Sequence, residues 1–398
     1  MSQSNMINIV KDIRDEVVDS SQANSSFLET SSRSVSTMAQ QAKQDPERQR
    51  RFAESAQLLA GVMQGKLPTH ALQEAMATSD FPLLFGDVID RLLLAGYRHS
   101  PQTFQAYTRV TTVPDFRPVN RHYVDGADGV LDEVKQQQEY KLDTMDEGKY
   151  QYQVKKFGKL LQFAWETLIN DDLDAFADAP ERLGRGARRS EEKFVTNLFL
   201  SGSGPRGTFF TSGNNNVIEG NPKLNVEGIQ KGFTQMRSQK DPTTGEPIYN
   251  RPRYLVVPPE LEVQARQIIN ATEIRSKGTG GGTSEQEMIT ANWMRNDLQI
   301  VVNDYIPVVA KDAANPPWFL FADPSEGRGA MEFGRLRGYE DPTLMMKSPN
   351  AMRPGGGQLG DPMWGDFDTD SITYKVRHVF GGTLMDPRYA VASNGSGE

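Results

Sequence analysis

The sequence predicts an α+β protein in which one long amphipathic helix precedes a domain of alternating strands and helices. Within residues 157–202, apolar and small side chains recur at steps of three and four, which is the helical period. Downstream, the segments RYLVVPP, ELEVQARQIINATEI, LQIVVND and WFLFADP alternate between strand and helix patterns. The chain closes with SITYKV, whose alternation predicts a final strand that pairs beneath the long helix.

The long helix is predicted to have one buried and one charged face. Asp178 is a suitable N-cap, Pro180 suits the first turn, and Gly202 suits the C-terminal end. We predict that the helix contacts solvent or another protein through its charged side, where opposite charges pair within the helix or across an interface. The predicted buried stripe is Phe176, Ala179, Leu183, Ala187, Ser190, Phe194 and Leu198, and the charged face is Arg182, Arg185, Arg188, Arg189, Glu192 and Lys193.

Length and composition exclude several classes of protein. The 398 residues suffice for two ordinary domains or one large domain. A net charge of -8 argues against binding of nucleic acid by a generally basic surface, although a local basic patch is compatible with it. The absence of cysteine excludes disulfides, thiolate zinc sites and cysteine nucleophiles. The sequence has neither an apolar run of about 20 residues nor the core of a signal peptide, so we expect no membrane partner.

The N-terminal region is polar and carries only thin helical stripes. Residues 1–78 are interpreted either as a disordered tail or as an arm that becomes ordered against neighbouring subunits. The first strongly apolar helix is predicted from Asp80 to Ala95, and the globular part begins there.

Residues 114–157 are predicted to form an extended hairpin. Tyr150, Tyr152 and Val154 alternate with polar residues, which is typical of a half-buried strand. The middle of the segment, DEVKQQQEYKLDTMDEGK, is too polar to be buried. We therefore expect the hairpin to project from the body and to lie on a partner.

The candidates for chemistry have simpler structural explanations. Asp171, Asp172 and Asp174 could ligate a metal or act as an acid and base in a hydrolase, but carboxylates at a helix start also interact favourably with its dipole. The glycines at 278 and 280–282 follow a helix instead of a strand and lack the Gly-Lys-Ser/Thr ending of a phosphate loop. We predict no catalytic residue, metal or cofactor, since the histidines are also too scattered for a zinc site or a triad: His70, His99, His122 and His378.

The run INDDLDAF, followed by Pro180 and LGRGARRSEEKFV, resembles the spine-helix signature of tailed-phage major capsid proteins, particularly those of the Mu-like head-subunit group. The order of segments from Asp80 to Ala392 is also similar. The resemblance implies the HK97-like capsid fold. Its parts would be an N-terminal arm or scaffold-like segment at 1–78, the N-terminal helix of the peripheral domain at 79–113, an extended loop at 114–157, the spine helix and peripheral domain at 158–224, an axial domain at 225–365, and a closing strand and tail at 366–398.

The same resemblance implies a function in assembly. Copies of the chain would form hexamers and pentamers of an icosahedral shell, assembled in the host bacterial cytoplasm, that encloses double-stranded DNA through non-specific contacts. A portal and possible decoration or scaffold proteins are the expected partners. Candidate contacts between subunits are Arg185, Arg188, Arg189 and Glu192 on the helix, Gly280 and Gly281 at the capsomer centre, and Lys135, Lys141 and Lys149 on the extended loop, where some relatives link a lysine to an asparagine.

Two other functions remain open from the sequence. An encapsulin-like compartment would share the fold but package an enzyme, and a carboxylate-dependent hydrolase would use Asp171, Asp172 and Asp174. Particles of megadalton size would favour a shell, whereas a monomer or small oligomer would favour the hydrolase.

Overall fold

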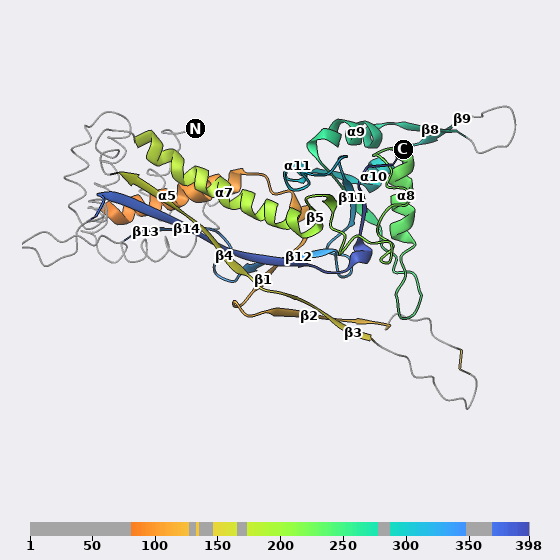
Figure 1. The fold of residues 1–398 in the computed structure, drawn as a ribbon, viewed down its shortest axis with the longest axis horizontal. Helices are drawn as coiled ribbons and strands as arrows, with labels where there is room; N and C mark the ends of the chain where they lie inside the picture. The colour runs from red at the N-terminus through yellow and green to blue at the C-terminus, as the bar shows by residue number, and fades with distance from the viewer. Residues whose placement is uncertain are drawn as a thin grey trace, which may run out of the picture. The chain divides into compact units, whose positions relative to one another are not determined.

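The computed structural model describes residues 81–126, 133–134, 146–164, 173–277, 287–347 and 368–397 (Figure 1). The chain divides into two compact units. Unit 1 comprises residues 1–101, 156–189 and 339–379, and unit 2 comprises residues 102–155, 190–338 and 380–398. The long helix α7 (Leu173–Phe199) and the long strand β14 (Ser371–Leu384) each contribute residues to both units.

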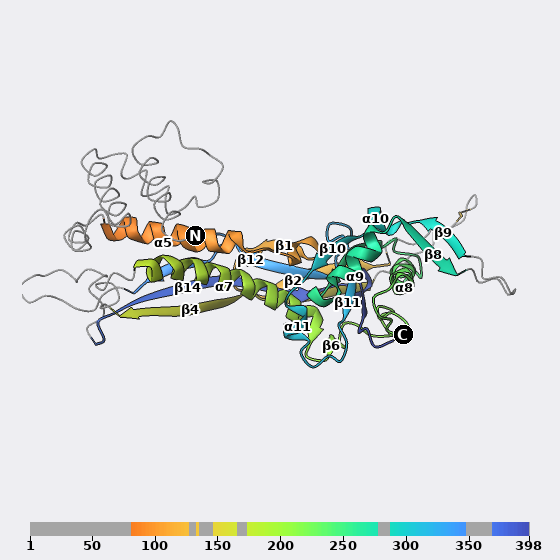
Figure 2. The same ribbon diagram turned by 90° about the horizontal axis from the view of Figure 1, so that it is seen from above.

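Unit 1 packs two helices and a set of antiparallel strands. Helix α5 (Phe81–His99) lies alongside the N-terminal part of α7 (Figure 2). Strands β13 (Thr343–Met346) and β4 (Lys155–Ala164) both pair with β14, and Leu344 lies opposite Val376. The apolar core joins these elements through Leu93, Leu94, Leu183, Leu344 and Val376.

Two glycines allow α5 and α7 to approach each other closely. A Cβ atom at Gly184 would lie 2.0 Å from the carbonyl oxygen of Leu93, and one at Gly96 would lie 2.2 Å from that of Glu181. Both obstacles are backbone atoms, which cannot move aside as a side chain can. The glycine pattern therefore fixes where these helices cross.

The part of the β14 sheet that belongs to unit 2 carries a cluster of aromatic rings. Strand β1 (Arg109–Val113) pairs in parallel with β12 (Met331–Leu336), and β12 pairs antiparallel with the end of β14. Ring centroids of Phe104, Phe194 and Phe380 lie between 4.9 and 6.3 Å from that of Phe333. A short helix, η1 (Phe104–Ala106), precedes β1 and supplies one of these rings.

The second sheet of unit 2 has the order β10 (Gln299–Val302), β7 (Pro252–Val257), β11 (Trp318–Ala322) and β15 (Ala390–Ser393). Only the β10–β7 pair is parallel. Helix α8 (Val226–Arg237) packs on this sheet at Gly232, where a Cβ atom would lie 2.8 Å from Leu320. Helix α9 (Pro259–Asn270) follows β7.

Apart from the two hairpin strands within residues 119–152, which are described below, the remaining elements of unit 2 are short. They are β5 (Leu200–Ser201), β6 (Gly204–Pro205), β8 (Glu273–Lys277), β9 (Glu287–Ala291), α10 (Met294–Asp297), α11 (Ile306–Val309) and η3 (Pro387–Tyr389).

Several predicted elements are confirmed, namely the helices α5, α8 and α9 and the strands β7, β10, β11 and β14. The segment predicted as an axial domain, 225–365, supplies strands to three sheets, because β12 and β13 pair with β14 instead of with β7 and because β8 and β9 pair with each other. Strand β15, from the predicted closing segment, pairs with β11. The glycine-rich run at 353–362 lies outside the described residues.

Helix α7 differs from the prediction in its start and in its buried face. It begins at Leu173, and Pro180 lies inside it, so Asp178 is not the N-cap. Ser190 of the predicted stripe is exposed, whereas Arg188 and Glu192 of the predicted charged face are buried. The buried face is shifted because polar partners inside the protein satisfy these charges. Its members include Ala187, Arg188, Glu191, Glu192, Val195, Thr196 and Phe199.

Candidate functional site: the anchored hairpin

The predicted hairpin is present as a two-stranded ladder in unit 2. Strand β2 (Val119–Asp125) pairs antiparallel with β3 (Asp146–Tyr152), from the Val119–Tyr152 pair to the Asp125–Asp146 pair (Figure 1). Side chains on both strands alternate between covered and exposed, as the sequence alternation predicts for β3, whereas in β2 the polar Arg121 and Asp125 are covered and Val124 is exposed. The residues that join the strands, 127–145, lie outside the described residues except for 133–134.

An aromatic stack stiffens the ladder. The rings of Tyr123 and Tyr150 lie 4.6 Å apart at an interplanar angle of 22°, and the Arg328 guanidinium lies 4.7 Å from the centre of the Tyr123 ring. Gly148 leaves room for this ring, because a Cβ atom there would lie 2.2 Å from the Tyr123 Cζ atom. The Gly–Tyr pair across the strands therefore holds the ring flat on the ladder.

The first anchor of the hairpin is Glu332 of β12, whose side chain is completely buried. Its carboxylate accepts hydrogen bonds from Arg121 Nε (2.9 Å), Thr111 Oγ1 (2.9 Å) and Tyr152 Oη (2.6 Å). Arg121 also contributes an ion pair at 2.8 Å. A buried carboxylate is tolerated when its oxygens are satisfied in this way, and the donors come from both strands of the hairpin.

The environment of Tyr152 shows how tightly this anchor is packed. Burial, followed by the hydrogen bond to Glu332, raises the pKa of Tyr152 to about 12, so the hydroxyl remains a donor. Its ring lies on Gly334, where a Cβ atom would be 2.6 Å from the hydroxyl oxygen. The glycine in the strand sequence MEFGRL is therefore part of the anchor.

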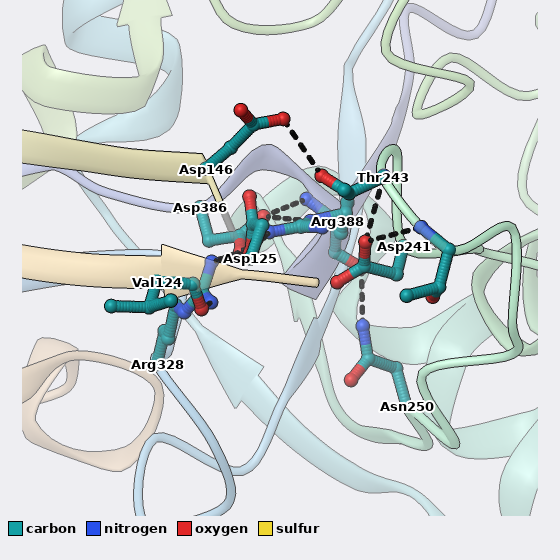
Figure 3. Close-up of polar contacts among 10 residues, drawn as sticks. Val124, Asp125, Asp146, Asp241, Thr243, Asn250, Arg328, Asp386 and Arg388 are labelled. Carbon is teal, nitrogen blue, oxygen red and sulfur yellow. Dashed lines mark hydrogen bonds and ion pairs between the residues drawn. The ribbon is translucent and has the colours of Figure 1, made fainter. Parts of the chain in front are cut away.

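The second anchor lies at the other end of the ladder and contains two aspartates and two arginines (Figure 3). Asp125 pairs with Arg328 at 2.5 Å and with Arg388 at 3.3 Å. Asp386 pairs with Arg388 at 2.5 Å and with Arg328 at 3.5 Å. The formal charges balance, which offsets the desolvation of an aspartate, Asp386, that is only 1% exposed. Burial alone would lower the pKa of Arg388, but its bonds to Asp386 and Asp125 raise it.

A neighbouring loop is attached to the second anchor. Thr243 Oγ1 donates to Asp146 at 3.1 Å, and Asn250 Nδ2 donates to the carbonyl oxygen of Arg388 at 2.9 Å (Figure 3). Burial would raise the pKa of Asp241, but backbone N–H groups of Thr243, Thr244 and Gly126 more than offset it and lower the pKa. The ladder, the loop at 239–250 and η3 are thus joined at one place. A shallow cavity of about 400 Å³ lies beside them.

Two of the predicted interface residues on α7 are used within the subunit. Arg188 is 7% exposed, with Nε 3.3 Å from the carbonyl oxygen of Tyr97 and its guanidinium 3.8 Å from the centre of that ring. Glu192 is 5% exposed and accepts from Thr103 Oγ1 at 2.9 Å and from the Phe104 N–H at 3.4 Å. Their burial inside the chain corrects the prediction that both lie on an exposed charged face.

Those of the other predicted interface residues that the structure describes are not brought together. Arg185 pairs with Glu181 at 2.6 Å within α7, and Arg189 is exposed. Lys149 is exposed on β3, opposite His122. Lys135, Lys141, Gly280 and Gly281 lie outside the described residues. A role in contacts between subunits stays a prediction for all of these.

The described residues contain no group of three or more potential metal ligands. Asp171, Asp172 and His70 lie outside them, and Asp174 belongs to the first turn of α7. His378 is buried with its ring 5.7 Å from that of Tyr97. No helix in the described part of the chain is long and apolar enough to cross a membrane.

Sequence reasoning missed every charged residue of the two anchors. The available signal was local. Glu332 is the single carboxylate in the strand segment MEFGRL and stands between the apolar Met331 and Phe333, and such a residue needs a buried partner. Asp386, Pro387 and Arg388 form a second signal, since Asp386 caps η3 by accepting from the Arg388 N–H at 3.0 Å.

The buried charges of this site thus hold elements of the chain in place. A family model described as phage capsid protein matches residues 148–393, more than half of the chain. The chain belongs to this family of phage capsid proteins. It is a major capsid protein and forms the shell of a virion.

Solved structures with similar chains also come from phages. A chain of Microbacterium phage Oxtober96 is 11% identical with a TM-score of 0.45, and the match covers 74% of this chain and 91% of that one. A chain of Mycobacterium phage Ogopogo is 13% identical with a TM-score of 0.42, and the match covers 74% of this chain and 91% of that one. A chain of the procapsid of bacteriophage JBD30 is 11% identical with a TM-score of 0.36, and the match covers 79% of this chain and 75% of that one. No curated protein matches the sequence. The family assignment rests on the sequence match to the family model.

Proposed function

We propose that copies of this chain assemble into hexamers and pentamers of an icosahedral shell, and that the hairpin region at 114–157 makes a contact with a neighbouring subunit. The observation that carries the proposal is the attachment of the β2–β3 ladder at both ends, by Glu332 and by the Asp125–Arg328–Asp386–Arg388 cluster. A ladder that is fixed in this way sets the position and direction from which the connection between Asp125 and Asp146 starts. Preorganisation of this kind reduces the entropy that association must overcome.

The shell contacts would be heterologous, because a hairpin on one copy meets a different surface on the next. Repetition of such a contact closes a ring when the rotation that relates one subunit to the next divides a full turn evenly. Each contact can be weak, since every subunit makes several of them.

The wider assignment follows the family. We infer that the shell encloses double-stranded DNA through non-specific contacts, that it assembles in the host bacterial cytoplasm, and that a portal and decoration or scaffold proteins complete the particle. The exposed Arg189 and Lys149 are candidates for contacts between subunits, since neither is buried within the chain.

The experiment shortens the hairpin without touching its anchors. Replacing residues 127–145 with Asn-Gly leaves Gly126 and both strands in place and supplies a turn that suits a tight hairpin. We expect the variant to keep the far-ultraviolet circular dichroism of the wild type but to form no closed shells in negative-stain electron microscopy. Normal shells from this variant would refute the hairpin contact. A wild-type protein that stays monomeric under all assembly conditions would refute the shell itself.

A further inference from the structure

The loop at 239–250 presents a tyrosine in an unfavourable backbone conformation. Tyr249 has φ = +58°, in the left-handed region that bulky L-residues rarely adopt. The other described non-glycine residues with positive φ are Asn215, Asn221 and Asp370, and these are residue types that tolerate it. Tyr249 is also 82% exposed, so burial of its ring within the subunit does not offset the strain.

The loop holds Tyr249 in this conformation from both sides. The Ile248 N–H donates to the carbonyl oxygen of Gln239 at 3.1 Å, and the Asp241 N–H donates to that of Glu246 at 2.8 Å. On the other side, Asn250 is buried and donates to the carbonyl oxygen of Arg388 at 2.9 Å. The ring is therefore displayed outward by a fixed frame.

The frame belongs to the same junction as the hairpin. Thr243 Oγ1 of this loop donates a hydrogen bond to Asp146, the first residue of β3, and Asp241 accepts one from the N–H of Gly126, which directly follows β2. The loop that carries Tyr249 is thus bonded to the hairpin strands through Thr243 and Asp146 (Figure 3).

We propose that Tyr249 anchors a contact between two copies of this chain, by burying its ring in the surface of the second copy. The inference rests on the proposed function, because the partner of a shell subunit is another copy of itself. Strained residues persist where function requires them, and tyrosine is favoured at the centres of interfaces because it buries a large ring and keeps a hydrogen-bonding hydroxyl.

Replacement of Tyr249 by glycine tests two consequences of this proposal separately: the backbone strain in the isolated subunit and the role of the ring in assembly. Glycine adopts positive φ without strain, so Tyr249→Gly raises the thermal unfolding midpoint of the isolated subunit, by roughly 2 °C. The same change removes the ring, so the subunit concentration required for shell formation rises at least about tenfold. Tyr249→Phe keeps the ring and stays within about threefold of the wild type. Light scattering and negative-stain microscopy report assembly, and calorimetry reports the midpoint.

Asp370→Gly is the matched control, since Asp370 is exposed and has φ = +45°. It places glycine in the same left-handed backbone region and leaves the assembly concentration unchanged. A Tyr249→Gly protein that assembles like the wild type, or one with a lowered midpoint, overturns the inference while the wild-type shells still support the proposed function. A wild type that forms no shells overturns both.

Discussion

Glu192 is a charged side chain of α7 that works inside its own subunit. Burial raises the pKa of this carboxyl, against the opposing effect of hydrogen bonds from Thr103 and Phe104. The folded state therefore binds a proton more tightly than the unfolded state, whose glutamates titrate near about 4.3. The contribution of Glu192 to the free energy of unfolding is most favourable below the unfolded-state pKa, and it decreases as the pH rises through the folded-state pKa.

Glu192→Gln removes this titration. We expect the difference in free energy of unfolding, variant minus wild type, to move in favour of the variant as the pH rises from about 4 to about 7. Urea denaturation at a series of pH values measures it. Glu326→Gln, at an exposed position, controls for the loss of one negative charge. Parallel curves for wild type and Glu192→Gln would show that the burial of this carboxyl has no linkage to folding.

At the scale of elements, the long helix was predictable but its buried face was not. Periodicity assigns polar residues to the outside, and this rule fails where a charge finds a partner deep in the fold. Glu191 is buried because Arg335, 144 positions away in sequence, pairs with it at 3.1 Å. No local pattern contains that pairing. Strand β3, by contrast, alternates in sequence as it does in burial and could be predicted, whereas β2 covers Arg121 and Asp125 and exposes Val124.

The close crossing of α5 and α7 predicts that two glycine-to-alanine changes on α7 alter the free energy of unfolding in opposite directions. Gly184→Ala places a methyl group against the backbone of Leu93 and should lower the free energy of unfolding by about 3 kcal/mol. Gly186→Ala, two residues away, meets nothing within 4 Å and should raise it by about 0.5–1 kcal/mol, because alanine loses less entropy in a helix. Urea denaturation compares both variants. Equal effects of the two changes would contradict the close helix packing.

At the scale of the whole molecule, the fold class and the family were predictable because they depend on the order of segments and on one local run around α7. The anchors were not predictable, because each joins residues that are distant in sequence. Glu332 meets Tyr152 across 180 positions and Thr111 across 221. Such a cluster exists only once β1, β12 and the hairpin have come together, so a lone carboxylate between Met331 and Phe333 was the sole local sign of it.

Glu332 therefore gives a prediction that links subunit stability to assembly. Glu332→Gln keeps the shape but removes the charge that pairs with Arg121. Because Arg121 is 39% exposed and water still solvates it, we expect a loss of only about 2 kcal/mol in the free energy of unfolding. The hairpin would lose the fixed direction given by its first anchor, so closed shells should form more slowly even under conditions where the subunit is fully folded.

The matched control is Glu262→Gln, which removes an exposed ion pair with Arg266 on α9. Surface pairs at this spacing contribute about 0.3–0.5 kcal/mol, so this variant should unfold and assemble like the wild type. Urea denaturation and time-resolved light scattering measure the two effects. If Glu332→Gln lost stability but formed shells at the wild-type rate, anchoring would serve the fold alone, and the direction of the hairpin would have to be set by the neighbouring subunit during assembly.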